Sequence, residues 1–157
     1  RHGRRMRYVS TFIVIVGDTE EQAWRKADQV LEEFLAMQAR KSPDLTTKGE
    51  SNFTQRPENL SRQVETAAAG VRQDKCLWMG MTLATQGRSG NQTTLVGTPE
   101  QVADALMDYY DLGVTNFLLR GYRPLDDSAE FGRGLIPRLR ELAAHRRSDR
   151  EPQRLSA

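Results

Sequence analysis

The sequence has few of the residues that most hydrolytic and metal-dependent chemistries need: its 157 residues include two histidines and one cysteine. His2 and His145 lie near the two ends, so an internal Ser-His-Asp triad or a histidine metal site is hard to build, and we predict no metal site. The lone Cys76 excludes an internal disulfide and fits a reducing compartment. Hydrolase and zinc-enzyme functions are therefore disfavoured.

Long apolar runs are also missing. No window approaches the length of a membrane span, and no signal peptide precedes the first apolar segment. The apolar and charged fractions, 38% and 28%, are typical of a soluble globular domain. We therefore expect a cytoplasmic protein with no membrane contact.

Clustered positive charge is scarce in the body of the chain. Lys and Arg number 23 against 21 Asp and Glu, and the excess lies at the ends. Arg1, Arg4, Arg5 and Arg7 precede the first apolar segment, and residues 146–157 hold four more arginines. A nucleic-acid surface needs clustered basic side chains on the folded part, so we expect no nucleic-acid partner.

What the sequence does contain is a clear strand, helix, strand pattern over residues 94–122. An apolar run ends in Gly97 and is followed by Thr98 as N-cap, Pro99 at the first helical position and Gln101 at the position of a capping box. The helix carries an apolar stripe, and Gly113 can supply the left-handed turn that ends it. The stripe consists of Val102, Leu106 and Tyr109, with Tyr110 beside it. The next strand, 117–119, is apolar on both faces, which indicates a parallel sheet covered by helices.

Two further segments repeat this pattern. Residues 12–16 form an apolar strand that ends at Gly17, and residues 19–22 repeat the threonine-to-glutamine capping box before an amphipathic helix. After the strand at 117–119, a second amphipathic helix follows, in which Pro137 predicts a kink or a restart. The apolar stripes of the two helices are Trp24, Ala27, Leu31 and Phe34, widened by Val30 and Leu35, and then Phe131, Leu135, Leu139 and Leu142. Three successive βα units predict an α/β fold.

Residues 40–92 interrupt this pattern. Residues 40–59 are mostly polar and longer than an ordinary loop, a helix is predicted from about Pro57 to Ala69 with Gly70 as its stop, and residues 85–91 form a polar glycine-containing loop. We predict that 40–92 is an insertion between sheet elements. Residues 146–157 are predicted to be a disordered polar tail.

Tyr122 is the strongest candidate for a site residue, because ligands bind at the carboxyl ends of parallel strands. The alternative, less favoured, is that its ring simply packs beneath a loop. Arg88 in the polar loop, and Arg120 and Arg123 beside Tyr122, can attract an anion or remain solvated surface charges. For Cys76, packing is favoured over an activated thiol. Trp24 and Trp78 are predicted to be core anchors.

Several runs carry a family resemblance. They begin at Leu95 (LVGTPEQVADAL), Tyr110 (YDLGV), Phe117 (FLLRGY) and Glu130 (EFGRGLIP), and upstream matches extend through Leu77-Trp78 and the helix start TEEQAW to His2-Gly-Arg4. Together they resemble the C-terminal part of luciferase-like flavin-dependent monooxygenases, with the alkanesulfonate monooxygenase subgroup as the most similar. The pattern is specific over this span, although each piece alone is weak.

The resemblance implies a TIM (β/α)8 barrel with insertions. It also implies that reduced FMN arrives from a separate flavin reductase and is used with O2 to oxygenate a small organic substrate. Residues 1–145 would then supply the last three of eight βα units, with 40–92 as the insertion and lid region. We therefore expect the C-terminal part of a longer enzyme, inactive by itself and a homo-oligomer when full length.

Position by position, Tyr122 matches the tyrosine that ends the last barrel strand, which implies a catalytic role. Arg88 lies in the loop that matches the mobile lid, and Arg120 and Gly121 are the other candidates for binding flavin or substrate. Thr11 and Ile13 stand where the alkanesulfonate enzymes carry an Arg-x-His pair. An organosulfur substrate is therefore retained as a class, while an alkanesulfonate is disfavoured.

Two hypotheses remain. The first is the FMN-dependent monooxygenase just described. The second is a non-catalytic α/β fragment or accessory subunit without a complete flavin site. Because three strands leave sheet edges unpaired, we expect the chain to expose apolar surface and to associate.

Overall fold

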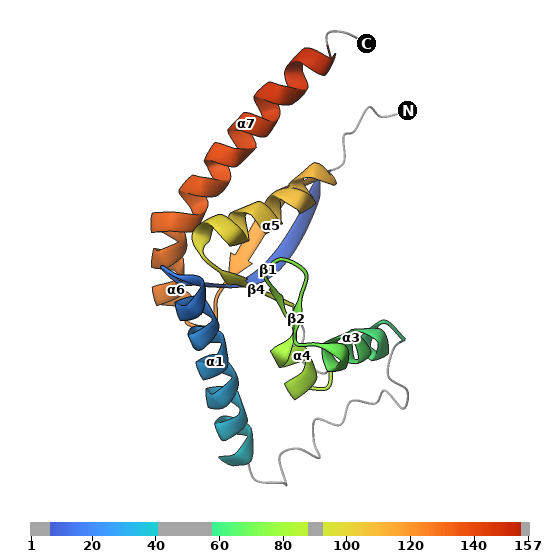
Figure 1. Cartoon of the computed structure of the whole chain (residues 1–157), viewed down its shortest axis with the longest axis vertical. Helices are drawn as coiled ribbons and strands as arrows, with labels where there is room; N and C mark the ends of the chain where they lie inside the picture. Colours follow the sequence, from blue (N-terminus) through green and yellow to red (C-terminus); the bar gives the residue numbers. More distant parts are fainter. Residues whose placement is uncertain (1–6, 41–57, 88–92, 155–157) are drawn as a thin grey trace.

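The computed structural model describes residues 7–40, 58–87 and 93–154 of the chain (Figure 1). The elements are, in order, β1 (Tyr8–Val16), α1 (Glu20–Arg40), α3 (Glu58–Ala69), β2 (Arg72–Gln73), β3 (Leu77–Trp78), α4 (Gly80–Ala84), β4 (Thr94–Gly97), α5 (Pro99–Asp111), β5 (Val114–Arg120), α6 (Pro124–Glu130), the π-helix η2 (Phe131–Leu135) and α7 (Ile136–Arg154). No helix within these ranges combines the length and the apolar character that crossing a membrane requires. Residues 41–57, most of the loop predicted at 40–59, and Arg88 lie outside the described residues.

The described residues form a sheet of five strands in the order β2-β3-β4-β1-β5. Strand β1 pairs in parallel with β4 on one side and with β5 on the other, while the short strands β2 and β3 add to the far side of β4 in antiparallel orientation. Each of the three parallel strands is followed by a helix, so the α/β class with three βα units is confirmed.

The strand order differs from that of a closed barrel. In a (β/α)8 barrel, successive parallel strands are neighbours, which would place β4 between β1 and β5. Here β1 lies in the middle, so the α5 connection from β4 to β5 passes over it. The sheet is open and mixed, and the predicted barrel itself is not seen in the described residues.

Helices cover the two faces of β1 unequally. Phe12, Val14 and Val16 belong to a core cluster with α5, η2 and α7, whereas Ile15 belongs to a second cluster with α1, Trp78 and α4. This alternation is the period of two expected for a strand buried on both faces. Figure 1 shows α5 lying along the sheet, whereas α1 and α7 extend well beyond it.

The predicted capping box of α5 is present. The Thr98 hydroxyl accepts a hydrogen bond from the Gln101 amide at 3.3 Å, and the Gln101 side chain accepts one from the Thr98 amide at 2.9 Å. Pro99 occupies the first turn, and Gly113 has the positive φ of +105° expected just beyond the helix end. A local pattern of a few residues thus fixes where β4 ends and α5 begins.

Two sequence predictions need correction and one gains detail. Helix α7 continues to Arg154, so the prediction of a disordered tail from residue 146 is wrong for residues 146–154. Leu35, placed in the α1 stripe, is 49% exposed because the distal half of α1 leaves the sheet. The break predicted at Pro137 takes the form of the π-helix η2, which ends one residue before α7 begins. The predicted helix at 57–69 is confirmed as α3.

Candidate functional site

A crevice of about 420 Å³ lies at the carboxyl ends of β1 and β5. The two strands are neighbours, but α1 leaves β1 toward one face, whereas the residues that follow β5 pack into the cluster on the other face. Such a divergence is a topological switch point, the place where open α/β sheets bind ligands. The lining residues are Ile15, Lys26, Val30, Tyr122, Arg123, Asp126, Asp127, Ala129, Glu130 and Arg133.

Tyr122 lines this crevice and also reaches across β1. Its hydroxyl lies 3.1 Å from the hydroxyl of Thr94, a fully buried residue at the start of β4. Burial raises the pKa of Tyr122, and the Thr94 hydrogen bond partly opposes this rise. The phenol is therefore neutral at ordinary pH, and its polar end is held by an internal partner. The ring packs against the α1 cluster, and Tyr122 also lines the crevice at the carboxyl ends of β1 and β5. Its role in ligand binding stays a prediction.

Lys26 joins α1 to the far wall of the crevice. Its ammonium donates to the carbonyl oxygen of Val16 at 2.9 Å and to both carboxylate oxygens of Glu130 at 2.8 Å. The pair is about one-third exposed, so solvent weakens its attraction only in part. Lys26 therefore ties the end of β1 to α6.

The turn between β5 and α6 is built around Asp127. Its carboxylate accepts a hydrogen bond from the amide of Arg123 at 2.7 Å. Burial raises the pKa of Asp127, and that hydrogen bond partly lowers it again. A side chain at Gly121 would overlap the Asp127 carboxylate, so glycine is required there for the turn to close. Gly121 thus has a structural reason to be present, apart from the binding role predicted for it.

Arg133 differs from the other cations of the crevice. Arg123 pairs with Glu33 at 2.6 Å and Lys26 pairs with Glu130, whereas no ion pair joins Arg133 to a residue in the described ranges. It sits in the π-helix η2 between two glycines, and a methyl group added at Gly132 would meet nothing within 4 Å. π-Helical turns occur often at functional sites. Arg133 is therefore the cation of this crevice that is most available to a ligand.

Sequence reasoning missed four of these residues. Asp127, Glu130 and Arg133 follow one another at three-residue spacing along α6 and η2. Lys26 joins them only through the pairing of β1 with β5, which a linear pattern does not reveal. The one local signal was the placement of Arg133 between two glycines in the EFGRGLIP run.

Of the other predicted residues, Arg120 ends β5 and is exposed, in register with Ile13. Ile13 also pairs with Thr94, so residues 11, 13, 120 and 122 share one face of the sheet. Thr11 and Ile13, which the resemblance matches to an Arg-x-His pair, therefore lie on the Tyr122 face. Arg88 lies outside the described residues.

Cys76 is packed, as predicted. It is 4% exposed, and desolvation raises its pKa to about 11, so little thiolate exists near neutral pH. The neighbouring Lys75 pairs with Asp104 and Asp108 at 2.8 Å and is not free to activate it. Trp24 and Trp78 are buried, which confirms them as core anchors.

The crevice as a whole can recognise a ligand that has an anionic end and a flat or apolar body. Arg133 offers a guanidinium, Tyr122 and Val30 offer ring and aliphatic surface, and the acidic residues oppose a second anionic group. Within the described ranges, no group of His, Cys, Asp and Glu side chains is placed to hold a metal ion.

Comparison with known proteins identifies the protein family. The family model described as luciferase-like monooxygenase matches residues 1–116, which span β1, α1, β4 and α5 and end inside β5. Tyr122 and the crevice residues after it lie beyond the matched segment. Because the match covers well over half of the sequence, the chain belongs to the luciferase-like monooxygenase family.

Proposed function

We propose that the chain is the C-terminal part of a flavin-dependent monooxygenase of the two-component kind. It would use reduced FMN, supplied by a separate reductase, and O2 to oxygenate a small organic substrate, with organosulfur compounds as the candidate class. Family membership supports the reaction type. The observation that carries the site is the crevice at the switch point, with Tyr122 and Arg133 in its walls.

The crevice residues fit a flavin in two respects. Its volume of about 420 Å³ lies within the ~300–1,000 Å³ of small-molecule pockets. Arg133 is a guanidinium without an ion-pair partner in the described ranges, which suits a phosphate or another anionic group. When bound, reduced flavin supplies the electrons that activate O2.

The chain's own residues would hold and shield that group. Tyr122 offers one face of its ring to the crevice. Its hydroxyl is held by Thr94, which fixes the position of that ring. Lys26 and Glu130 fix the distance between α1 and α6, and so the width of the crevice. The three parallel strands are fewer than the eight of a barrel, and we propose that further βα units complete the site.

The binding part of this proposal is tested by anaerobic titration of reduced FMN, followed by the change in flavin fluorescence. Arg133→Gln should weaken binding by about tenfold, the effect of one charge-assisted contact. The matched control is Arg147→Gln, an exposed arginine of α7 away from the crevice, which should leave affinity unchanged. Equal affinities of parent and Arg133→Gln would remove Arg133 from the site.

The reaction is tested with the protein, a flavin reductase, NADH and isotopically labelled O2. Transfer of labelled oxygen to an organosulfur substrate supports the proposal. Either hydroxyl can be the donor in the Thr94–Tyr122 pair, and when Thr94 donates, the Tyr122 hydroxyl can still donate to the substrate. Tyr122→Phe keeps the ring and removes that donor, so it should bind flavin like the parent while the oxygenation rate falls. Unchanged rates would exclude a catalytic role for that hydroxyl.

A second candidate function is a non-catalytic accessory subunit. It is favoured by the internal pairing of the crevice groups, since Tyr122, Lys26 and Arg123 already have partners within the chain. Failure of the chain to bind reduced FMN, together with cooperative unfolding of the same sample, would favour this function over the first.

A further inference from the structure

Thr94 is a buried polar residue at the start of an apolar strand. All four residues of β4 are buried, and Thr94 is 0% exposed. A valine has nearly the same shape and suits the interior of a sheet, whereas a hydroxyl there is stable only with a hydrogen-bond partner. The partner of the Thr94 hydroxyl therefore indicates what a threonine does at this position.

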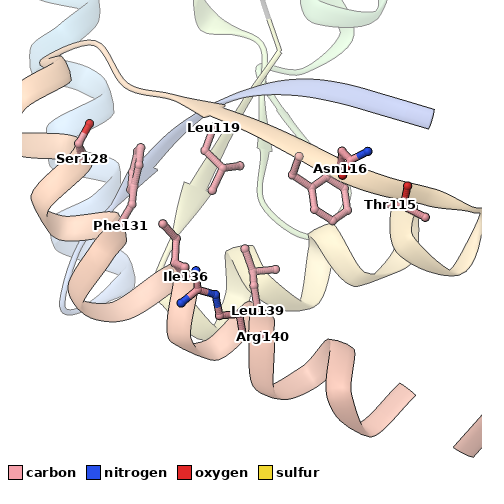
Figure 2. A pocket seen from close by; sticks show the side chains of 9 residues that line it. Thr115, Asn116, Leu119, Ser128, Phe131, Ile136, Leu139 and Arg140 are labelled. Atoms are coloured by element: carbon pink, nitrogen blue, oxygen red, sulfur yellow. The ribbon is translucent and has the colours of Figure 1, made fainter. Parts of the chain in front are cut away.

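Thr94 and Tyr122 lie on the same face of the sheet. Side chains alternate along β5, and Figure 2 shows Leu119 turned toward α7. Arg120 therefore lies on the opposite face, where it shares the register of Ile13 with Thr94. Tyr122, just beyond β5, packs against the α1 cluster on that same face, and its hydroxyl lies 3.1 Å from that of Thr94.

The surroundings of the two hydroxyls determine which one donates. Among the residues that the structure describes, Tyr122 is the one hydrogen-bond partner of the Thr94 hydroxyl. If Tyr122 donated, the proton of Thr94 would be enclosed without an acceptor, which is costly. If Thr94 donates, the remaining proton belongs to Tyr122, which is partly exposed and lines the crevice, where water or a ligand can accept it. Donation by Thr94 therefore leaves no enclosed proton unpaired.

The pKa of Tyr122 agrees with this assignment. Burial raises that pKa, and the hydrogen bond with Thr94 lowers it. A hydrogen bond lowers the pKa of a phenol when it stabilises the phenolate, which a donor to the phenol oxygen does.

We propose that Thr94 is a positioning residue for Tyr122. It donates to the phenol oxygen, holds the ring at the carboxyl ends of β1 and β5, and leaves the proton of Tyr122 to be donated to a substrate in the crevice. Thr94 is not among the described residues that line the crevice, so it acts through Tyr122. The inference rests on the proposed function, because it assigns that proton to the oxygenation reaction.

The donor is identified without flavin, from the infrared C–O stretch of Tyr122, which is the band lost in Tyr122→Phe. Accepting a hydrogen bond weakens the phenol C–O bond and donating one strengthens it, so Thr94→Val should shift this band to higher frequency. Thr94→Ser keeps the donor and should keep the parent frequency. The matched control is Thr82→Val, the same change at another described threonine that is 0% exposed, and it should leave the band in place. An unshifted band in Thr94→Val, or one shifted to lower frequency, would overturn the proposal.

Turnover tests the role of this hydrogen bond, with thioanisole as the organosulfur probe and the labelled sulfoxide as the measured product. Thr94→Val should lower kcat by about tenfold, the effect of one hydrogen bond, while affinity for reduced FMN stays that of the parent. Thr94→Ser should restore kcat. Thr94→Val combined with Tyr122→Phe should be no slower than Tyr122→Phe alone, because Thr94 acts through Tyr122.

The outcomes separate this inference from the proposed function. An active parent chain whose Thr94→Val variant keeps the parent kcat, or whose losses from Thr94→Val and Tyr122→Phe add, would overturn the role of Thr94 alone. A parent chain that neither binds reduced FMN nor forms sulfoxide would overturn the proposed function and, with it, the role of Thr94 in the reaction.

Discussion

Strands β4 and β5 each contain a short apolar run, but their surroundings differ. Both are apolar on both faces, and both lie parallel to β1, on opposite sides of it. Every residue of β4 is buried, with Leu95 2% exposed, whereas Leu118 of β5 is 54% exposed. The difference arises because β4 has β3 on its outer side and helices on both faces, while β5 is at the edge. An apolar sequence pattern thus shows which faces of a strand favour burial. It does not show which of those faces another strand or helix covers.

The largest expected difference in stability is between leucine-to-alanine substitutions in β4 and in β5. Leu95→Ala removes a buried side chain from the core cluster and should lower the free energy of unfolding by about 2–5 kcal/mol. Leu118→Ala removes a side chain that is half in solvent and should lower it by less than about 1 kcal/mol. Urea denaturation of both variants measures the difference. Equal losses would mean that Leu118 is covered in solution.

The next largest effect on stability concerns the hydrogen bond between the hydroxyls of Tyr122 and Thr94. Tyr122→Phe leaves the buried Thr94 hydroxyl without its partner and should cost about 1–3 kcal/mol of stability. Thr94→Val should cost a comparable amount. The two losses should not add, because either substitution removes the same hydrogen bond, and a double-mutant cycle measures the coupling. Simple additivity would show that the hydroxyls do not interact.

A smaller effect on stability distinguishes the N-terminal ends of α5 and α6, the helices that follow β4 and β5. Thr98→Ala removes the cap of α5 and should destabilise the protein by about 1 kcal/mol, while Thr98→Ser should restore most of this. At the start of α6, the side chain of the N-cap residue Arg123 makes no capping hydrogen bond. Arg123→Ala loses an exposed ion pair with Glu33 and should cost between zero and about 1 kcal/mol. Thermal unfolding midpoints check both values.

The smallest effect concerns the pH dependence at the end of β5. Because burial raises the folded-state pKa of Asp127, this carboxyl contributes its stability below its ordinary pKa and loses it as pH rises through the folded value. Asp127→Asn cannot ionise. The stability of the parent relative to Asp127→Asn should therefore fall as pH increases from 3 toward 7, which urea titrations at several pH values would show. A rise over that range would contradict the direction of the shift.

Local features were predictable from the sequence. The cap at Thr98, the turn at Gly113 and the helix at 57–69 each depend on a few neighbouring residues, and each was correct. The tail was predicted wrongly because its charge suggested disorder. Extending a helix that has already formed needs no new nucleus, and Arg and Glu are good helix formers, so α7 continues.

The candidate site was predictable only where it is local. Tyr122 was placed at a strand end from its own neighbours, but its partner Thr94 is 28 residues away in sequence. That contact exists because β1 lies between β4 and β5, an order set by long-range pairing. Lys26 and Glu130, 104 residues apart, meet for the same reason.

The π-helix Phe131–Leu135 has a consequence for how this chain tolerates insertions and deletions. A π-turn accommodates one residue more than an α-turn, and each residue of an α-helix turns the chain by about 100°. Deleting Gly132, whose neighbourhood is open, would let the segment return to regular α-helix with little rotation of α7, because the wide π-turn already absorbs the one extra residue. Leu139 and Leu142, which pack against the core cluster, would therefore keep facing it. A deletion in the regular helix after η2 would instead turn the following residues by about 100° away from that face.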